Sequence, residues 1–239
     1  MKADYILDLF WPRRCEVCGG GADRPGRHVC SACLMRMPFV PTEGCCRVCG
    51  KAVEDLDGEY LCEDCGGRDA PAFDRAAGAV RFEGRARELV LCYKSARRLW
   101  LRDDFADWLE AAARSRFDVA AVDLVLPMPA TFVHRFLRGY NQCEYLASEL
   151  ARRFGRAYRS DVVARCGSPR RQAELDEASR RENVKGTFAV GKPELVRGRT
   201  VLVVDDVMTT GSTLSECARA LKSAGAWRVW CVTVAQAVR

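Results

Sequence analysis

The chain has 239 residues, of which 49 % are hydrophobic, and a formal net charge of +6. This length and composition predict an ordinary folded protein with one large domain or a medium and a small one, and the mild positive charge is compatible with phosphate-bearing ligands without identifying one. Asp4 and Asp8 interrupt the apolar patch near the start, and no later segment offers about 18 unbroken apolar residues, so we expect a cytoplasmic location without a secretory signal or membrane insertion.

Cysteines crowd the amino-terminal third, where nine of the 14 fall between positions 15 and 65. The segment CEVCG, which begins at Cys15, recurs as CRVCG at Cys46, and CSAC at Cys30 recurs as CEDC at Cys62. Two copies of one small module are therefore expected. Metal binding explains these pairs better than disulfides, because we expect a reducing compartment.

Each C-x-x-C pair brings two thiolates into one tight turn, and two such turns complete a tetrahedral shell for zinc. A closed shell of four thiolates predicts a structural site, because a module of about 30 residues needs such a staple to fold. We expect two structural Zn²⁺ ions in a double zinc ribbon over residues 1–70, with the ligands Cys15, Cys18, Cys30, Cys33, Cys46, Cys49, Cys62 and Cys65.

The spacing leaves the pairing of these ligands open. Each module can close its own site, as the tandem repeat favours, or the first and third pairs can interleave with the second and fourth. Cys45 is ambiguous, although only Cys46 keeps the two-residue spacer to Cys49, and His28 is interpreted as a loop residue because the cysteine set is already complete. The remaining cysteines, at positions 92, 143, 166, 217 and 231, are interpreted as core or helix residues.

From residue 71 onward the pattern changes to alternating strand-like and helix-like segments after a short proline-containing connector. Strands are expected at AAGAVRFEG, AVDLVLPMP, TVLVV and WRVWCVTVA, and helices at RARELVLCYKSA, DDFADWLEAAARS, QCEYLASELARRFG and TLSECARALKSAG. The charged stretch from residue 165 to residue 185 is expected to be mobile. Strands separated by helices of this length predict an α/β domain over residues 71–239 with a parallel sheet flanked by helices.

The segment VLVVDDVMTTGST, residues 201–213, carries the chemistry. Asp205 and Asp206 should emerge at the carboxyl edge of the sheet, where ligands of such folds bind. The start of the next helix should then bind a phosphate through its free backbone amides. Gly211 lets the backbone approach the phosphate closely, and hydroxyl groups come from Thr209, Thr210, Ser212 and Thr213. Two adjacent carboxylates suit the hydroxyls of a ribose or a hydrated Mg²⁺, so a ribose 5-phosphate group satisfies both halves.

This segment resembles the phosphoribosyl pyrophosphate (PRPP) motif of type I phosphoribosyltransferases. Together with CEVCG and CRVCG, the segments PMPATFVHRFLRGYNQ (residues 127–142) and RRQAELDEASRRENVKGTF (residues 170–188) resemble the ComF family of competence-associated phosphoribosyltransferase-like proteins. The resemblance spans nearly the whole chain. It implies a type I phosphoribosyltransferase-like sheet behind an amino-terminal double zinc ribbon.

The resemblance also implies roles for individual residues. Arg135 and Arg138, with His134 beside them, would bind the pyrophosphate and act in catalysis together with Asp205 and Asp206. Asn141 would cap the helix that follows. The family pattern adds Lys94 and, in a loop that closes over PRPP, Gln172, Arg180, Arg181 and Asn183.

The expected function is that of a PRPP-binding, phosphoribosyltransferase-type protein that assists DNA uptake, with Mg²⁺ accompanying PRPP and DNA-uptake proteins as partners. No residue identifies the acceptor. Two alternatives stay open: a non-catalytic module that binds single-stranded DNA or a partner and is regulated by a nucleotide, and a salvage enzyme that uses a free nucleobase.

Overall fold

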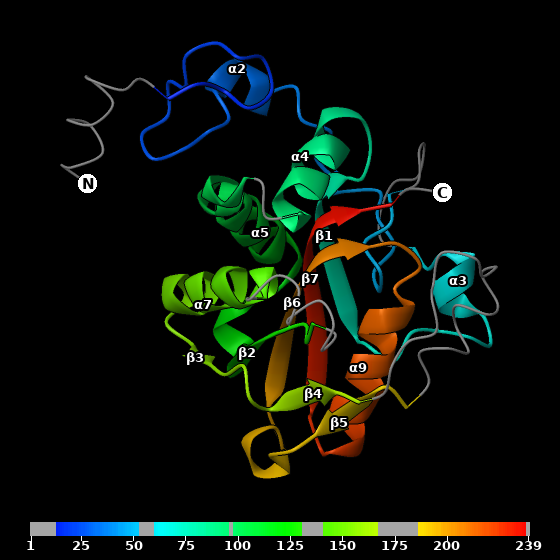
Figure 1. Ribbon diagram of the computed structural model, residues 1–239. Helices are drawn as coiled ribbons and strands as arrows, with labels where there is room; N and C mark the ends of the chain where they lie inside the picture. The colour runs from blue at the N-terminus through cyan, green and yellow to red at the C-terminus, as the bar shows by residue number, and fades with distance from the viewer. Residues whose placement is uncertain (1–12, 53–59, 96–97, 131–140, 167–185, 238–239) are drawn as a thin grey trace.

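A computed structural model of the chain describes residues 13–52, 60–95, 98–130, 141–166 and 186–237. A parallel sheet of five strands forms its centre, in the order β1, β7, β6, β2, β3 (Figure 1). Its strands are β1 (Arg75–Arg81), β2 (Leu124–Pro127), β3 (Ala157–Tyr158), β6 (Thr200–Met208) and β7 (Arg228–Gln236). The predicted parallel α/β fold is confirmed.

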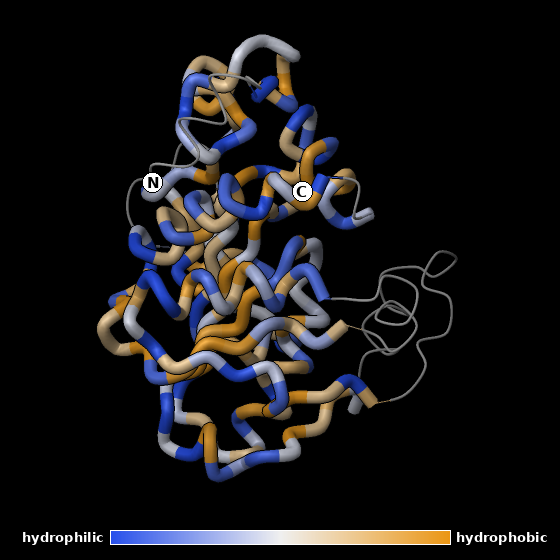
Figure 2. The backbone as a smooth tube through the Cα atoms, turned by 60° about the vertical axis from the view of Figure 1, so that its left-hand side comes forward, coloured by the Kyte–Doolittle hydropathy of each residue, from blue (hydrophilic) through white to orange (hydrophobic). Residues whose placement is uncertain are grey.

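Helices cover both faces of this sheet. In Figure 1, α4 (Gly84–Lys94), α5 (Arg102–Arg116) and α7 (Gln142–Phe154) lie on one side of it, and α9 (Ser212–Ser223) lies on the other. Leu202 and Val204 of β6 belong to the core on the first side, while Val201 and Val203 belong to the core beside α9. Both faces of the strand are buried, which explains its unbroken apolar sequence and the hydrophobic centre of Figure 2.

The ends of α7 follow the local sequence. The Asn141 side chain accepts a hydrogen bond from the backbone N–H of Cys143 at 3.1 Å, so it caps the helix as expected. At the other end Gly155 takes a left-handed conformation with φ of 64°, which a residue without a Cβ adopts at low cost. The helix therefore begins and ends where the sequence predicts.

Shorter elements complete the described residues. The strands β4 (Val163–Arg165) and β5 (Phe188–Val190) form a separate antiparallel pair, which the sequence analysis missed because each has only three residues. Three 3-10 turns are η1 (Leu99–Leu101), η2 (Val119–Ala121) and η4 (Pro193–Leu195). None of the helices among these residues has the length and apolar character needed to cross a bilayer.

The first cysteine module, with α2 (Ser31–Leu34), packs against α5. Arg27 donates hydrogen bonds to both oxygens of Asp107, at 2.6 and 2.8 Å, and Arg24 donates to Asp104 at 3.2 Å. Asp104 is fully buried, and the backbone N–H of His28 also donates to it at 2.8 Å. Charged side chains therefore join this module to the helix layer.

The second module, with α3 (Glu63–Gly66), is joined to the sheet edge instead. The backbone N–H of Ala76 in β1 donates to the carbonyl of Val48 at 2.6 Å, and Arg116 at the end of α5 donates to the carbonyl of Cys46 at 2.7 Å. Figure 1 shows α2 and α3 over different parts of the α/β domain. The predicted domain boundary near residue 70 stays a prediction.

Candidate functional site

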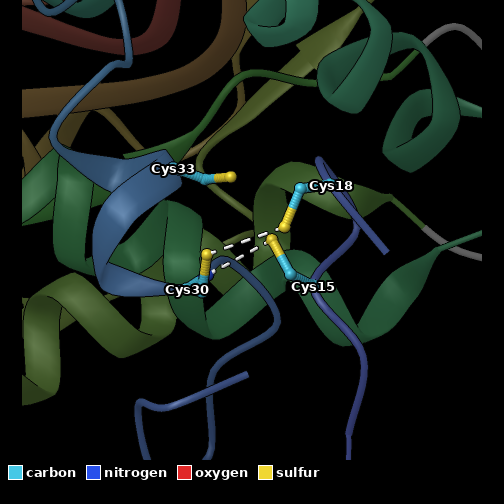
Figure 3. Close-up of side chains that lie close together, drawn as sticks. All are labelled: Cys15, Cys18, Cys30 and Cys33. Atoms are coloured by element: carbon cyan, nitrogen blue, oxygen red, sulfur yellow. Dashed lines mark hydrogen bonds between the residues drawn. The ribbon is translucent and has the colours of Figure 1, made fainter. Parts of the chain in front are cut away.

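The eight expected metal ligands gather in two clusters. Within each cluster the four sulfur atoms lie within 4.8 Å of one another. The first cluster is Cys15, Cys18, Cys30 and Cys33, and the second is Cys46, Cys49, Cys62 and Cys65. Figure 3 shows the side chains of the first cluster close together. Each module therefore closes its own site, which decides between the sequential and interleaved pairings.

The local geometry of the clusters fits zinc. The sulfur of Cys15 accepts hydrogen bonds from the backbone N–H groups of Val17 and Cys30, at 3.4 and 3.3 Å. Burial acts to raise the pKa of the Cys15 thiol, but the backbone amides outweigh it and lower the pKa to about 7. A sulfur that backbone amides hold near its thiolate form is a typical structural zinc ligand. Two structural zinc ions are consistent with these two clusters.

Two neighbouring residues lie outside the clusters. The thiol of Cys45 donates a hydrogen bond to the carbonyl of Pro41 at 3.1 Å, so it has a different partner from Cys46. The ring of His28 packs beside Trp100, with ring centroids 6.1 Å apart. His28 is not a member of either cysteine cluster.

The sheet has a topological switch point between β2 and β6, which are hydrogen-bonded neighbours. From β2 the chain runs through α7 to β3 at one edge, whereas from β6 it runs through α9 to β7 in the opposite direction. Such a point leaves a crevice at the carboxyl ends of the two strands. Asp205 and Asp206 lie near the end of β6, at this crevice.

Asp206 is 5 % exposed and has two side-chain partners from the helices on one face of the sheet. The ammonium group of Lys94, the last residue of α4, donates to its Oδ1 at 2.9 Å. The side-chain amide of Gln142, the first residue of α7, donates to its Oδ2 at 3.0 Å. Burial disfavours the charged amine of Lys94, but the carboxylate of Asp206 outweighs this and raises the pKa of Lys94 above its ordinary value.

Asp205 has a different environment. Its Oδ1 accepts hydrogen bonds from the backbone N–H of Asp206 at 2.8 Å and from the thiol of Cys143 at 3.5 Å. Burial and, next in weight, the neighbouring charge of Asp206 raise the pKa of Asp205 to about 7. A carboxyl group that titrates near neutrality beside a second carboxylate is a common feature of ligand sites.

The hydroxyl-rich loop follows directly. Gly211 has φ of +75°, a left-handed backbone conformation that favours glycine, and a Cβ there would be in ordinary contact with the Phe73 ring at 3.4 Å. The hydroxyls of Thr210 and Ser212 are 2.6 Å apart, and the backbone N–H of Ser212 points to Thr210 Oγ1 at 3.3 Å. The helix α9 begins at Ser212, so the first amides of the helix, which have no partner within it, and the positive end of its dipole lie at this loop.

A cavity of about 920 Å³ opens beside this loop. Thr209, Thr210, Gly211 and Ser212 line it, whereas Thr213, Asp205 and Asp206 are not among its lining residues. The structure therefore brings four of the five expected phosphate-binding residues to one cavity, and the two carboxylates lie outside its lining.

Several expected site residues lie outside the described residues. They are His134, Arg135, Arg138, Gln172, Arg180, Arg181 and Asn183. Hydrogen bonds join the described residues on either side of residues 131–140 to the sheet and to each other. The backbone N–H of Met128 donates to the carbonyl of Val204 at 2.8 Å, and the Asn141 side chain donates to the carbonyl of Met128 at 3.0 Å. The roles of the arginines stay predictions.

Sequence reasoning missed two contacts at this site. The sequence indicates Gln142 only as the end of the family segment and Cys143 as a core residue, yet both contact the carboxylates. Lys94, which the family pattern suggested, does reach Asp206. The signal in the sequence for Gln142 is that a polar residue occupies the first position of a helix that follows a strand of the sheet.

Comparison with known proteins agrees with this arrangement. Residues 6–66 match the model of the double zinc ribbon domain, and residues 141–238 match that of the phosphoribosyl transferase domain. The DNA utilization protein YhgH of Salmonella typhi is 30 % identical over 218 residues, which cover 83 % of this chain and 94 % of that protein. The chain belongs to the ComF/YhgH family.

Other members extend the similarity. The competence protein F of Haemophilus influenzae is 28 % identical over 90 % of this chain and 93 % of its own length. The YhgH protein of Escherichia coli K12 is 29 % identical over 83 % of this chain and 94 % of its own length. This ComF/YhgH chain therefore matches its relatives across both the ribbon and the α/β domain.

Solved structures give weaker matches. The PRPP amidotransferase of B. subtilis superposes with a TM-score of 0.38 and 20 % identity over 56 % of this chain and 26 % of that one. The hypoxanthine-guanine phosphoribosyl transferase of L. donovani has a TM-score of 0.30 and 15 % identity over 55 % and 67 % of the two chains. The fold of the ComF/YhgH chain rests on its strand order and on its family matches.

Proposed function

We propose that this ComF/YhgH protein binds PRPP, or a nucleotide with the same ribose 5-phosphate group, at the switch point between β2 and β6. One observation carries the proposal: β6 has two carboxylates near its carboxyl end and leads into a loop whose residues 209–212 line a cavity at the start of α9. Carboxylates that suit a sugar and backbone amides that suit a phosphate thus occur close together in the sequence, between Asp205 and Ser212.

The phosphate half of the site relies on α9. Its first amides have no partner within the helix, and its dipole favours an anion at this end. Thr209, Thr210 and Ser212 add hydroxyl donors at the same cavity, and Thr213, the next residue of α9, completes the set. These amides and hydroxyls can bind a phosphate monoester although none of them carries a formal positive charge.

The sugar half relies on Asp205 and Asp206. Carboxylate oxygens accept hydrogen bonds from the two ribose hydroxyls, and they also suit a hydrated Mg²⁺ that accompanies the diphosphate. Lys94 and Gln142 fix the position of Asp206, because each donates to a different oxygen of its carboxylate. Burial and the charge of Asp206 raise the pKa of Asp205 to about 7, so the Asp205 carboxyl group loses its proton as the pH rises through neutrality.

The reaction of this site is displacement of pyrophosphate from the anomeric carbon of PRPP. The bond from that carbon to the diphosphate oxygen breaks, and a bond to a nucleophile of the acceptor forms. Arg135 and Arg138 stabilise the departing diphosphate, and the carboxylates hold the ribose. Bound Mg²⁺ supplies further charge neutralisation of the diphosphate.

The biological role is assistance in DNA uptake in the cytoplasm. Support comes from the names of the relatives, competence protein F and DNA utilization protein YhgH, together with their similarity over both modules. Single-stranded DNA and DNA-uptake proteins are the partners that this role implies.

The test separates enzyme from binding module. Purified protein is incubated with PRPP, Mg²⁺ and a panel of purine and pyrimidine bases, and release of pyrophosphate is followed while PRPP binding is measured by titration calorimetry. Binding with base-dependent release supports the transferase, and binding without release supports the nucleotide-regulated module. Absence of PRPP binding contradicts the proposed function.

A further inference from the structure

The cavity beside the phosphate loop has two walls from different parts of the chain. One wall is the loop and the exposed side of α9, up to Arg219. The other comes from the second cysteine module, with Cys49, Lys51, Asp64, Cys65 and Arg68. The zinc ribbon is therefore part of the same concave surface as the loop that we propose to bind phosphate.

The position of this wall is fixed by contacts with the sheet. The side chain of Gln236, the last residue of β7, donates to the carbonyl of the zinc ligand Cys49 at 3.0 Å. In the register of the sheet, Gln236 pairs with Met208, which directly precedes Thr209. A Cβ on Gly50 would lie 2.7 Å from the carbonyl oxygen of Ala76, so the glycine permits the close approach of the module to β1. Gln236 therefore links the two walls: its side chain bonds to the ribbon, and its backbone pairs with the residue that precedes the phosphate loop.

The ribbon brings unpaired positive charge to this cavity. Within the part of the chain that the structure describes, the side chains of Lys51 and Arg68 make no hydrogen bond or ion pair. The acidic residues of the cavity already have partners. Glu216 forms an ion pair with Arg219 and accepts a hydrogen bond from the backbone N–H of Gly186. Asp64 and Asp69 each take part in a polar or electrostatic interaction as well. Gln236 is 4 % exposed, and its Oε1 has no hydrogen-bond partner among the described residues.

We propose that the second zinc ribbon is a functional part of the phosphate site, in which Lys51 and Arg68 bind the 5′-phosphate of the ligand held by the loop at the start of α9. This inference rests on the proposed function. An anion between a helix amino terminus and two cations is neutralised from both sides. The four cysteines of the second cluster would hold a zinc ion there, and that ion would fix the segment around Lys51 together with the hydrogen bond from Gln236 to the Cys49 carbonyl.

The first ribbon has a different part in the molecule. It contacts α5 through Arg24 and Arg27, and none of its described residues lines the cavity. The two modules, although repeats of one sequence pattern, are therefore unequal: the second one contributes side chains to ligand binding and the first one is joined to the helix layer.

The test uses the full-length, zinc-loaded protein and two ligands, ribose 5-phosphate and PRPP. The double variant Lys51→Ala with Arg68→Ala is compared with Arg14→Ala with Arg36→Ala, which removes the same charge from exposed positions on the first ribbon. Both doubles keep all eight zinc ligands, so zinc content and circular dichroism should match those of the wild type.

We expect the Lys51 and Arg68 double variant to bind both ligands at least about tenfold more weakly, because the loss of even one charged hydrogen bond costs roughly that factor. The first-ribbon double should bind as the wild type does. Equal affinities of the cavity double and the wild type overturn the inference, and so does an equal loss in both doubles, which indicates general charge. Failure of the wild type itself to bind either ligand contradicts the proposed function instead.

Discussion

The ammonium group of Lys94 donates a hydrogen bond to Oδ1 of Asp206 at 2.9 Å, which joins the end of α4 to the end of β6. The carboxylate side chain is 7 % exposed and that of Lys94 is 37 % exposed. The buried carboxylate therefore depends on this cation and on the amide of Gln142.

Replacement of Lys94 by methionine should destabilise the fold, because it leaves a buried carboxylate with a single side-chain donor. We expect the free energy of unfolding in urea to fall by about 1–3 kcal/mol. Arg85→Ala is the matched control, since Arg85 lies on the same helix and its ion pair with Glu88 is more than half exposed. The control should change stability by less than about 0.5 kcal/mol. Equal effects in the two variants would show that Asp206 does not need Lys94.

The raised pKa of Asp205 predicts a pH-dependent stability. Its carboxyl group loses a proton near pH 4 in the unfolded chain but near pH 7 in the fold. Between these values the folded chain holds the extra proton, so this contribution is fully present below about pH 4 and is lost as the pH rises through 7. Asp205→Asn removes the contribution, and the stability of the variant relative to the wild type should increase from pH 5 to pH 8 in denaturant titrations. A difference that stays constant over this range contradicts the prediction.

The zinc content of single cysteine variants should distinguish adjacent residues. Wild-type protein should contain about two zinc ions per chain, because two closed clusters of four thiolates are present. Cys46→Ser should reduce this to about one, whereas Cys45→Ser should retain two, since Cys45 donates to the carbonyl of Pro41 instead. Elemental analysis of the three proteins gives the answer. Loss of zinc in the Cys45 variant would place that thiol among the ligands.

Asp107 is the main acceptor between the first ribbon and the helix layer. It accepts from Arg27, Arg24 and, at 3.0 Å, from Arg153. Burial acts to raise the pKa of Asp107, but the hydrogen bonds and charges of Arg27 and Arg153 outweigh it and lower that pKa. Asp107→Asn should therefore speed amide hydrogen exchange in residues 15–33 and leave residues 46–52 unchanged. Equal protection of the first ribbon in variant and wild type would mean that other contacts hold it.

The sequence predicted those features that depend on local pattern. Apolar runs and helical periodicity predicted the parallel sheet, Asn141 and Gly155 marked the ends of α7, and the repeated C-x-x-C pairs marked the two metal clusters. These features could be read because their signals lie within a few residues of one another.

Features that depend on distant contacts could not be predicted. The C-x-x-C spacing is the same in sequential and interleaved ribbons, so only the tandem repeat favoured the sequential pairing that the two clusters show. Gln142 and Lys94 meet Asp206 only after three elements of the fold have packed together, and Lys51 shares a cavity with Thr210 although about 160 positions separate them in the chain. Spacing along the sequence carries no information about such contacts.

Titration of the protein with PRPP in the presence of Mg²⁺ tests the central claim most directly. The wild type is compared with Thr210→Val, which removes a hydroxyl from the phosphate loop, and with Thr42→Val at an exposed position between the ribbons. We predict that the wild type and the Thr42 variant bind equally and that the Thr210 variant binds about tenfold more weakly. Binding of equal strength in all three proteins, or no binding in any of them, would contradict the phosphoribosyl site.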